Sequence, residues 1–151
     1  MNAYSLDLEL ARKALASQPF SVYLGARLTA FGDGAATLEL DVREELHQQN
    51  GFVHGGVLSY AADNALTFAA GTVAGPGLLT AGYTIDYLRP AQGAVLRAHA
   101  QVVRPGRTRV ACRCELYLLD TEGNQTLCAI AQGTIAIAKT APPVSEQLSS
   151  P

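Results

Sequence analysis

The residues best suited to chemistry lie in and after one polar loop, between His47 and Ala65. Two adjacent glycines, Gly55 and Gly56, end the loop, and one carboxylate, Asp63, follows in an otherwise apolar run. Glycines let a ligand approach the backbone closely, and the free N–H groups at the start of a helix favour developing negative charge. The Gly55 N–H is therefore a candidate oxyanion donor for a carbonyl under attack.

Asp63 is the only charged residue between Val57 and Ala74, a run whose small apolar residues predict a helix buried on most sides. Burying an unpaired carboxylate costs several kcal/mol, on the order of its desolvation penalty. Two interpretations therefore stay open. The carboxylate either binds a buried backbone or hydroxyl group, or acts as a general base or nucleophile that faces a substrate channel.

The spacing of Gly55 and Asp63 has a consequence for assembly. They are eight residues apart, which in one helix separates them by about 12 Å at ~1.5 Å per residue. A base and an oxyanion donor must each come within ~3 Å of the reacting group. The spacing therefore predicts a homodimer in which the glycine of one protomer meets the aspartate of the other across a two-fold axis.

A short amphipathic helix is predicted before these residues. Leu6, Leu10 and Ala14 lie at helical spacing within residues 6–16, and Pro19 ends the helix.

Six β-strands are predicted from alternating patterns and from the turn residues between them. They cover residues 23–31, 36–42, 79–88, 94–103, 107–119 and 125–138. The last four are consecutive and joined by short turns, which favours an antiparallel meander with the long helix against one face. We therefore predict a single α+β domain over residues 1–138, followed by a Pro- and Ser-rich tail, 139–151, that we expect to be disordered.

Composition limits the functional classes. Hydrophobic residues make up 48% and charged residues 16%, enough for a core and for a subunit interface. A net charge of −2 does not favour binding to nucleic acid or to an anionic membrane. No run approaches the ~20 apolar residues of a membrane span, and the first twenty residues do not fit a signal or transit peptide. We therefore expect a cytoplasmic protein.

The cysteines and histidines do not predict a metal site. Cys112, Cys114 and Cys128 lie in predicted strands without CxxC spacing, which favours reduced structural cysteines. His47 and His99 have no companion ligands nearby in the sequence.

The motif N-G-x-x-H-G-G, from Asn50 to Gly56, with Asp63 nine residues after His54, resembles the PaaI-like acyl-CoA thioesterases of the 4-hydroxybenzoyl-CoA thioesterase superfamily. The resemblance spans about residues 32–138 and continues in Tyr83–Ala91, Gly93 and Val103–Arg107. It implies a hotdog fold, in which an antiparallel sheet wraps around one long central helix, with a short N-terminal helix. It also implies hydrolysis of acyl-CoA without a cofactor, by a homodimer or homotetramer.

The resemblance also implies roles for individual residues. The Gly55 N–H would polarise the thioester carbonyl, and Asp63 of the other protomer would activate water or attack the carbonyl. Thr80 falls where relatives place a Ser or Thr that orients this water. Many relatives carry an Asn at the position of Gln48, so either Gln48 or Asn50 would supply the polar amide.

Two further roles follow from the resemblance. His54 is a catalytic candidate that would support the turn before the helix, with direct proton transfer as the alternative. Arg104, Arg107 and Arg109 carry guanidinium groups suited to phosphate, and would contact the nucleotide end of coenzyme A.

Two other functions compete with hydrolysis. A hydratase or dehydratase of acyl thioesters uses the same architecture, but such enzymes pair a His with an acid in other local motifs. A non-catalytic acyl-CoA-binding protein would keep the pocket and lose the base, whereas this chain retains Asp63. The acyl group stays open, with Leu58, Ala62, Leu66 and Phe68 as candidate lining residues.

Overall fold

The computed structural model describes residues 3–138, and side chains from Asp7 onward. The predicted disordered tail, 139–151, lies outside the described residues. In chain order the elements are α1 (Ala3–Ala16), α2 (Pro19–Leu24), β1 (Arg27–Gly32), β2 (Ala35–Asp41), the 3-10 helix η1 (Glu44–Leu46), α3 (Gly55–Ala74), β3 (Leu78–Tyr87), β4 (Val95–Pro105), β5 (Arg109–Leu119) and β6 (Gln125–Ile137). No helix in this part of the chain is long and apolar enough to cross a membrane.

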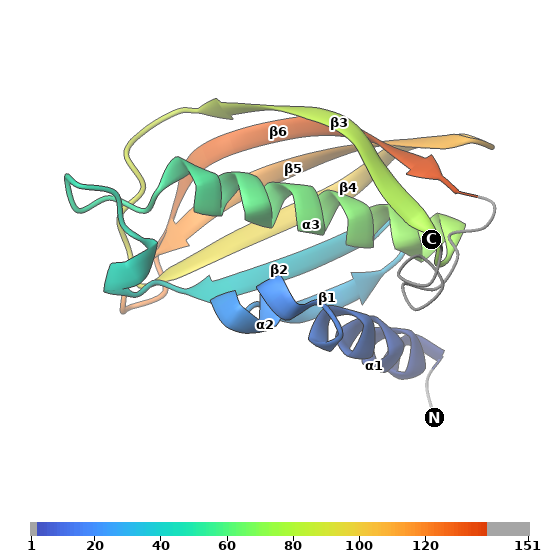
Figure 1. Ribbon diagram of the computed structural model, residues 1–151, viewed down its shortest axis with the longest axis horizontal. Helices are drawn as coiled ribbons and strands as arrows, with labels where there is room; N and C mark the ends of the chain where they lie inside the picture. Colours follow the sequence, from blue (N-terminus) through green and yellow to red (C-terminus); the bar gives the residue numbers. More distant parts are fainter. Residues whose placement is uncertain (1–2, 139–151) are drawn as a thin grey trace, which may run out of the picture.

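One antiparallel sheet wraps around α3, as Figure 1 shows, and this confirms the predicted α+β arrangement. Alternation along the strands sends apolar residues toward the helix, as with Leu38 and Leu40 of β2, which are about 1% exposed. On the helix, Ala62, Ala65 and Ala69 are fully buried. Their small side chains let the helix approach the curved sheet closely, so the core forms between α3 and the concave face.

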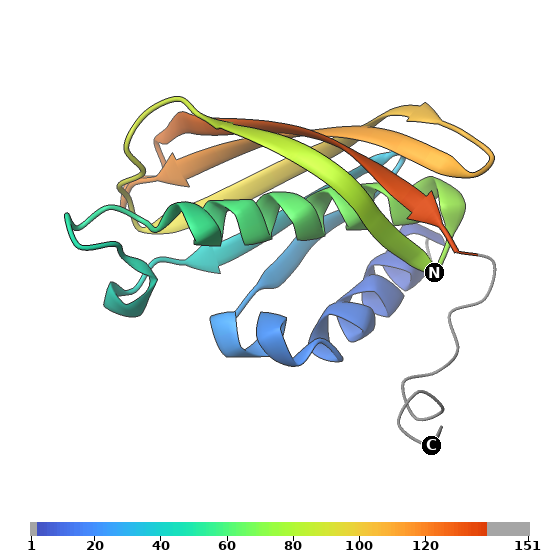
Figure 2. The same cartoon turned by 45° about the horizontal axis from the view of Figure 1, so that its top comes forward.

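The predicted meander is correct for β4, β5 and β6 and wrong for β3. The strand order is β1-β2-β4-β5-β6-β3, so β3 lies at one edge beside β6, and β4 pairs with β2 instead. The reason is the path of α3, which crosses the concave face and delivers the chain to the far edge (Figures 1 and 2). The segment after β3 then returns across the end of the sheet to β4.

The first strand begins later than predicted, because α2 occupies part of the predicted strand 23–31. Pro19 begins this helix, at a position where a missing N–H costs nothing. Ser21 of α2 is 1% exposed and accepts hydrogen bonds from Tyr60 Oη at 2.6 Å and Asn64 Nδ2 at 3.2 Å, both on α3. These bonds fix α2 against the central helix.

The helical period predicted for α1 is correct, but the predicted face is wrong. Leu10 is 63% exposed and Ala14 is exposed, whereas Ala11 and Leu15 are buried and Leu8 packs against the core. The buried residues are also three and four positions apart, so periodicity alone did not distinguish the two faces. Leu6 lies outside the described side chains.

Candidate active site

The N-terminus of α3 is capped by a histidine. Nδ1 of His54 accepts a hydrogen bond from the Gly56 N–H at 2.8 Å, and the His54 carbonyl accepts one from the Val57 N–H at 2.9 Å. Accepting at Nδ1 requires that this nitrogen carry no proton. The Gly55 N–H makes no hydrogen bond to any residue in the described part of the chain. One free donor therefore remains at the positive end of the helix dipole.

Both positions require glycine because other side chains lie close to where a Cβ would stand, and not because the backbone has a positive φ. The Tyr87 hydroxyl of β3 donates to the Gly55 carbonyl at 2.9 Å, and a Cβ on Gly55 would lie 3.2 Å from Tyr87 Cζ. A Cβ on Gly56 would lie 2.9 Å from His54 Nδ1. Burial, together with the neighbouring Tyr83, raises the pKa of Tyr87 above its ordinary value, so its hydroxyl is protonated and donates at neutral pH.

Successive turns of α3 contact β3 through a row of hydroxyl groups. Helix positions four apart lie on one face of α3. The edge strand β3 runs antiparallel to the helix alongside this face (Figure 1). In order along the helix, the pairs are Gly55 with Tyr87, Ser59 with Tyr83, and Asp63 with Thr80. The two residues predicted to act on a carbonyl therefore share one face of the helix, and the hydrogen-bonded Ser59 and Tyr83 hydroxyls lie between them.

Asp63 is held by a threonine. The Thr80 hydroxyl donates to Asp63 Oδ1 at 2.6 Å, and Thr67 Oγ1 lies 3.1 Å from Thr80 Oγ1 while donating to the Asp63 carbonyl at 3.0 Å. The residue is partly exposed, and its Oδ2 has no hydrogen-bond partner among residues 3–138. One oxygen is thus oriented, and the other is free to accept a proton or to attack.

A β-bulge makes the Thr80 contact possible. Strict alternation from Tyr87 and Tyr83, which face the helix, would turn Thr80 away from it. The register with β6 shifts between Thr80 and Gly82, which reverses the alternation and turns Thr80 toward Asp63. The family resemblance implied that Thr80 orients a water near the carboxylate, and the structure brings Thr80 and Asp63 together.

The two candidate amides lie in the loop that projects beyond the start of α3 (Figure 1). Oε1 of Gln48 accepts hydrogen bonds from the backbone N–H groups of Asn50 and Phe52, so it stabilises the loop itself. The Asn50 side chain is exposed and makes no hydrogen bond within the described residues. Neither amide contacts Asp63 of the same chain.

The three arginines are all exposed and lie at or beside the β4–β5 turn. Figures 1 and 2 show this turn at the end of the sheet opposite the start of α3. Within one chain, Arg104, Arg107 and Arg109 are therefore remote from Gly55.

The candidate lining residues belong to the core. Leu58, Ala62 and Leu66 are at most 2% exposed and Phe68 is 9% exposed. In the single chain these residues are buried, and which of them line an acyl pocket depends on the geometry of the dimer.

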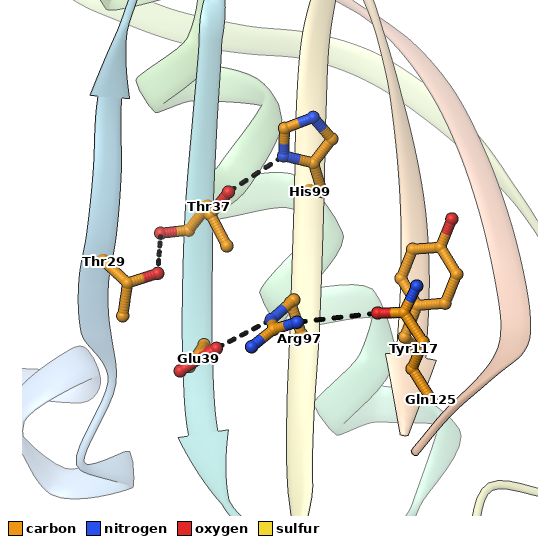
Figure 3. Close-up of a pocket in the computed structure, with 7 residues that line it drawn as sticks. All are labelled: Thr29, Thr37, Glu39, Arg97, His99, Tyr117 and Gln125. Carbon is orange, nitrogen blue, oxygen red and sulfur yellow. Dashed lines mark hydrogen bonds and ion pairs between the residues drawn. The ribbon is translucent and has the colours of Figure 1, made fainter. Parts of the chain in front are cut away.

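A groove of about 470 Å³ lies on the convex face of the sheet, away from α3 (Figure 3). Its lining residues are Thr29, Thr37, Glu39, Arg97, His99, Tyr117 and Gln125. Arg97 Nε donates to Glu39 at 2.8 Å, and Thr37 Oγ1 lies 2.8 Å from His99 Nδ1. These charged and polar groups satisfy one another across neighbouring strands, and the groove is separate from the row of hydroxyls.

The prediction of reduced structural cysteines is confirmed: Cys112, Cys114 and Cys128 are free and buried. Burial raises the pKa of Cys112 to about 11 and, with a contribution from Glu115, that of Cys114 to about 12. These thiols are therefore protonated at neutral pH and unsuited to nucleophilic chemistry.

Comparison with known proteins matches this chain to one protein family and to a related hydrolase. Residues 50–123 match the family described as the thioesterase superfamily. The 1,4-dihydroxy-2-naphthoyl-CoA hydrolase of Listeria monocytogenes is 26% identical over 118 residues, covering 77% of this chain and 93% of that protein.

Solved structures agree with this match. A thioesterase family protein from Silicibacter pomeroyi superposes with a TM-score of 0.81 at 29% identity, covering 90% of this chain and 98% of that chain. The E. coli PaaI protein from the phenylacetic acid degradation operon superposes with a TM-score of 0.79 at 20% identity, covering 93% and 99%. The latter likeness concerns the fold, and it confirms the hotdog arrangement expected from the sequence.

Proposed function

Because the chain belongs to the thioesterase superfamily and has the hotdog fold, we propose that it hydrolyses the thioester of an acyl- or aryl-CoA to the free acid and coenzyme A. One observation carries the proposal. Asp63 is oriented by Thr80 through one oxygen, keeps its other oxygen free, and shares a helix face with the unpaired Gly55 N–H. A base and an oxyanion donor are the two groups that acyl transfer to water requires.

In the proposed reaction, the thioester oxygen binds to the Gly55 N–H, which stabilises the negative charge that develops there. Asp63 of the partner subunit takes a proton from water, and the water oxygen forms a bond to the carbonyl carbon. The C–S bond then breaks, and the departing thiolate takes up the proton that Asp63 of the partner subunit received from water. Direct attack by Asp63 would use the same free oxygen and give an anhydride that water cleaves.

A dimer is part of this proposal, and the edge strand β3 supports it. In the described chain no strand pairs with the outer edge of β3. Leu79 within β3 is 61% exposed, and Leu88, directly after the strand, is 49% exposed. An unpaired edge with apolar side chains is a template for another strand. Two-fold pairing of β3 with β3 of the partner subunit would set the two α3 helices antiparallel. The N-terminus of one helix would then approach the middle of the other.

The same two-fold axis gives the arginines a role. It would bring the β4–β5 turn of one chain toward the end of the assembly where the partner's α3 begins. We assign Arg104, Arg107 and Arg109 to the phosphate groups of coenzyme A bound in that site, because guanidinium groups bind phosphate in bidentate fashion.

A thiol-release screen tests the function. Wild-type protein is incubated with acyl-CoAs of increasing chain length, with aryl-CoAs, and with acyl-carrier-protein thioesters, while a thiol reagent monitors free coenzyme A. We expect release with at least one acyl- or aryl-CoA and a loss of about 100-fold or more in the Asp63→Asn variant, whose fold and dimer stay intact.

Other outcomes would overturn the proposal. Conversion of an enoyl-CoA without thiol release would indicate a hydratase, and tight binding without turnover would indicate a binding protein. Wild-type rates in Asp63→Asn would remove the carboxylate from the mechanism.

A further inference from the structure

The peptide group between Gly55 and Gly56 is held at both ends. Its carbonyl accepts a hydrogen bond from the Tyr87 hydroxyl at 2.9 Å, and its N–H donates to His54 Nδ1 at 2.8 Å. The preceding N–H, that of Gly55, is the one left unpaired among the described residues.

This fixation has a physical reason. Two successive glycines at the start of a helix each cost about 1 kcal/mol relative to alanine, because their backbone is freer in the unfolded chain. The first turn of a helix also has few backbone hydrogen bonds of its own. The His54 carbonyl accepts a hydrogen bond from the Val57 N–H, which holds the peptide that carries the Gly55 N–H. The bond from Tyr87 holds the next peptide, so it limits rotation of the Gly55 backbone between the two. Catalysis requires donors to be held within about 0.5 Å.

We propose that Tyr87 is a positioning residue, whose hydroxyl bond to the Gly55 carbonyl fixes the direction of the Gly55 N–H toward the thioester oxygen. The inference rests on the proposed function, and it adds a residue to which the sequence motif gave no role.

The environment of Tyr87 indicates that the residue acts through its hydroxyl and not through burial of its ring. The side chain is 52% exposed, so the ring contributes little to the core. Its Cζ and Oη nevertheless lie 3.2 and 3.3 Å from the position of a Cβ on Gly55. Glycine at position 55 and tyrosine at position 87 therefore fit one another, because any larger side chain on the helix would displace the phenol.

Tyr83 supplies a matched control on the same strand. Its hydroxyl lies 2.5 Å from Ser59 Oγ, so it also connects β3 to α3, one turn further along the helix. If these bonds serve only to attach the strand, removing either hydroxyl should have the same effect. If Tyr87 positions the donor, only its loss should change the chemical step.

The kinetic test compares Tyr87→Phe with Tyr83→Phe. With the best substrate of the screen, we expect kcat of Tyr87→Phe to fall about tenfold with KM nearly unchanged, less than the ~100-fold expected for losing an oxyanion donor outright. We expect Tyr83→Phe to stay within about twofold of wild type, with similar melting temperatures for both variants. Unchanged kcat in Tyr87→Phe, or equal losses in the two variants, would overturn the inference.

A second measurement does not depend on turnover. In ¹⁵N-labelled protein, the order parameter of the Gly55 N–H should be lower in Tyr87→Phe than in wild type and Tyr83→Phe. Equal order parameters would overturn the inference. If no thioester is hydrolysed but this difference is found, the proposed function fails and the positioning of Gly55 by Tyr87 is supported.

Discussion

The Thr80 hydroxyl donates to Asp63 Oδ1 at 2.6 Å, across the contact between the edge strand β3 and the central helix α3. The contact exists because the register with β6 shifts between Thr80 and Gly82. The carboxylate is therefore oriented by the strand that also forms the open edge of the sheet. Formation of a dimer through that edge would act directly on Thr80, which holds the Asp63 carboxylate.

The first prediction concerns this hydrogen bond. In Thr80→Val we expect kcat to fall by roughly tenfold or more, because hydrogen bonds to charged groups contribute about 1.5–3 kcal/mol. Thr67→Val is the matched control, since the Thr67 hydroxyl contacts Thr80 and the Asp63 backbone but not the carboxylate. Steady-state kinetics check this, and an equal loss in both variants would contradict a specific role for Thr80.

The second prediction concerns the shared site. Asp63→Ala and Gly55→Pro are each expected to be inactive. Gly55→Pro removes the N–H at a helix position whose backbone tolerates proline, and its ring also displaces the Tyr87 phenol, which lies 3.2 Å from a Cβ at this position. A heterodimer of the two has one site with both groups intact, so it should regain about half the activity of a wild-type dimer. Refolding differently tagged chains together and isolating the heterodimer measures this. An inactive heterodimer of two folded variants would argue against a site built from two chains.

The third prediction concerns the close packing of β6 against β3. A Cβ on Gly133 of β6 would lie 2.6 Å from Tyr83 Cβ and 2.8 Å from the Gly82 carbonyl oxygen. We therefore expect Gly133→Ala to lower the free energy of unfolding by about 1–3 kcal/mol, the usual cost of overpacking. Urea denaturation measures the change.

Gly82→Ala is the control for this variant, because nothing lies within 4 Å of a Cβ at that position. Its stability should match that of wild type within about 0.5 kcal/mol. Equal destabilisation by the two changes would show that loss of glycine, and not the steric contact, is responsible.

The fourth prediction concerns the thiols. All three cysteines are buried, so a thiol reagent at pH 8 should not react with the native protein and should titrate three groups after unfolding. This also makes the thiol-release assay usable without a background from the enzyme. Rapid labelling of the native protein would contradict the burial of these side chains.

The fifth prediction is an alkaline loss of stability. Burial raises the pKa of Cys112 from 9.0 to about 11, so the folded state retains a proton that the unfolded state loses first. The free energy of unfolding should therefore fall as pH rises from about 9 toward 11. Urea denaturation at pH 8 and pH 10 measures the fall, which Cys112→Ala should reduce. A stability independent of pH in this range would contradict the prediction.

Much of the fold follows from local rules that the sequence expresses. The long helix ends at Gly75, with φ 72°, and the β1–β2 turn contains Asp33 and Gly34, with φ 53° and 77°. Such residues adopt positive φ at low cost, so their positions mark the ends of elements. The spacing of Gly55 and Asp63 likewise follows from the helical rise alone.

The sequence by itself thus determined the central helix, most strand boundaries and the presence of a carboxylate and a glycine pair on one helix. Only the tertiary structure decided that β3 lies at the sheet edge, that Leu10 of α1 is exposed, and that Thr80 and Tyr87 contact α3. The physical reason is the distance along the chain over which each kind of interaction acts. Helical and strand periods depend on neighbours a few residues apart, whereas strand order and side-chain contacts depend on how distant segments share one core.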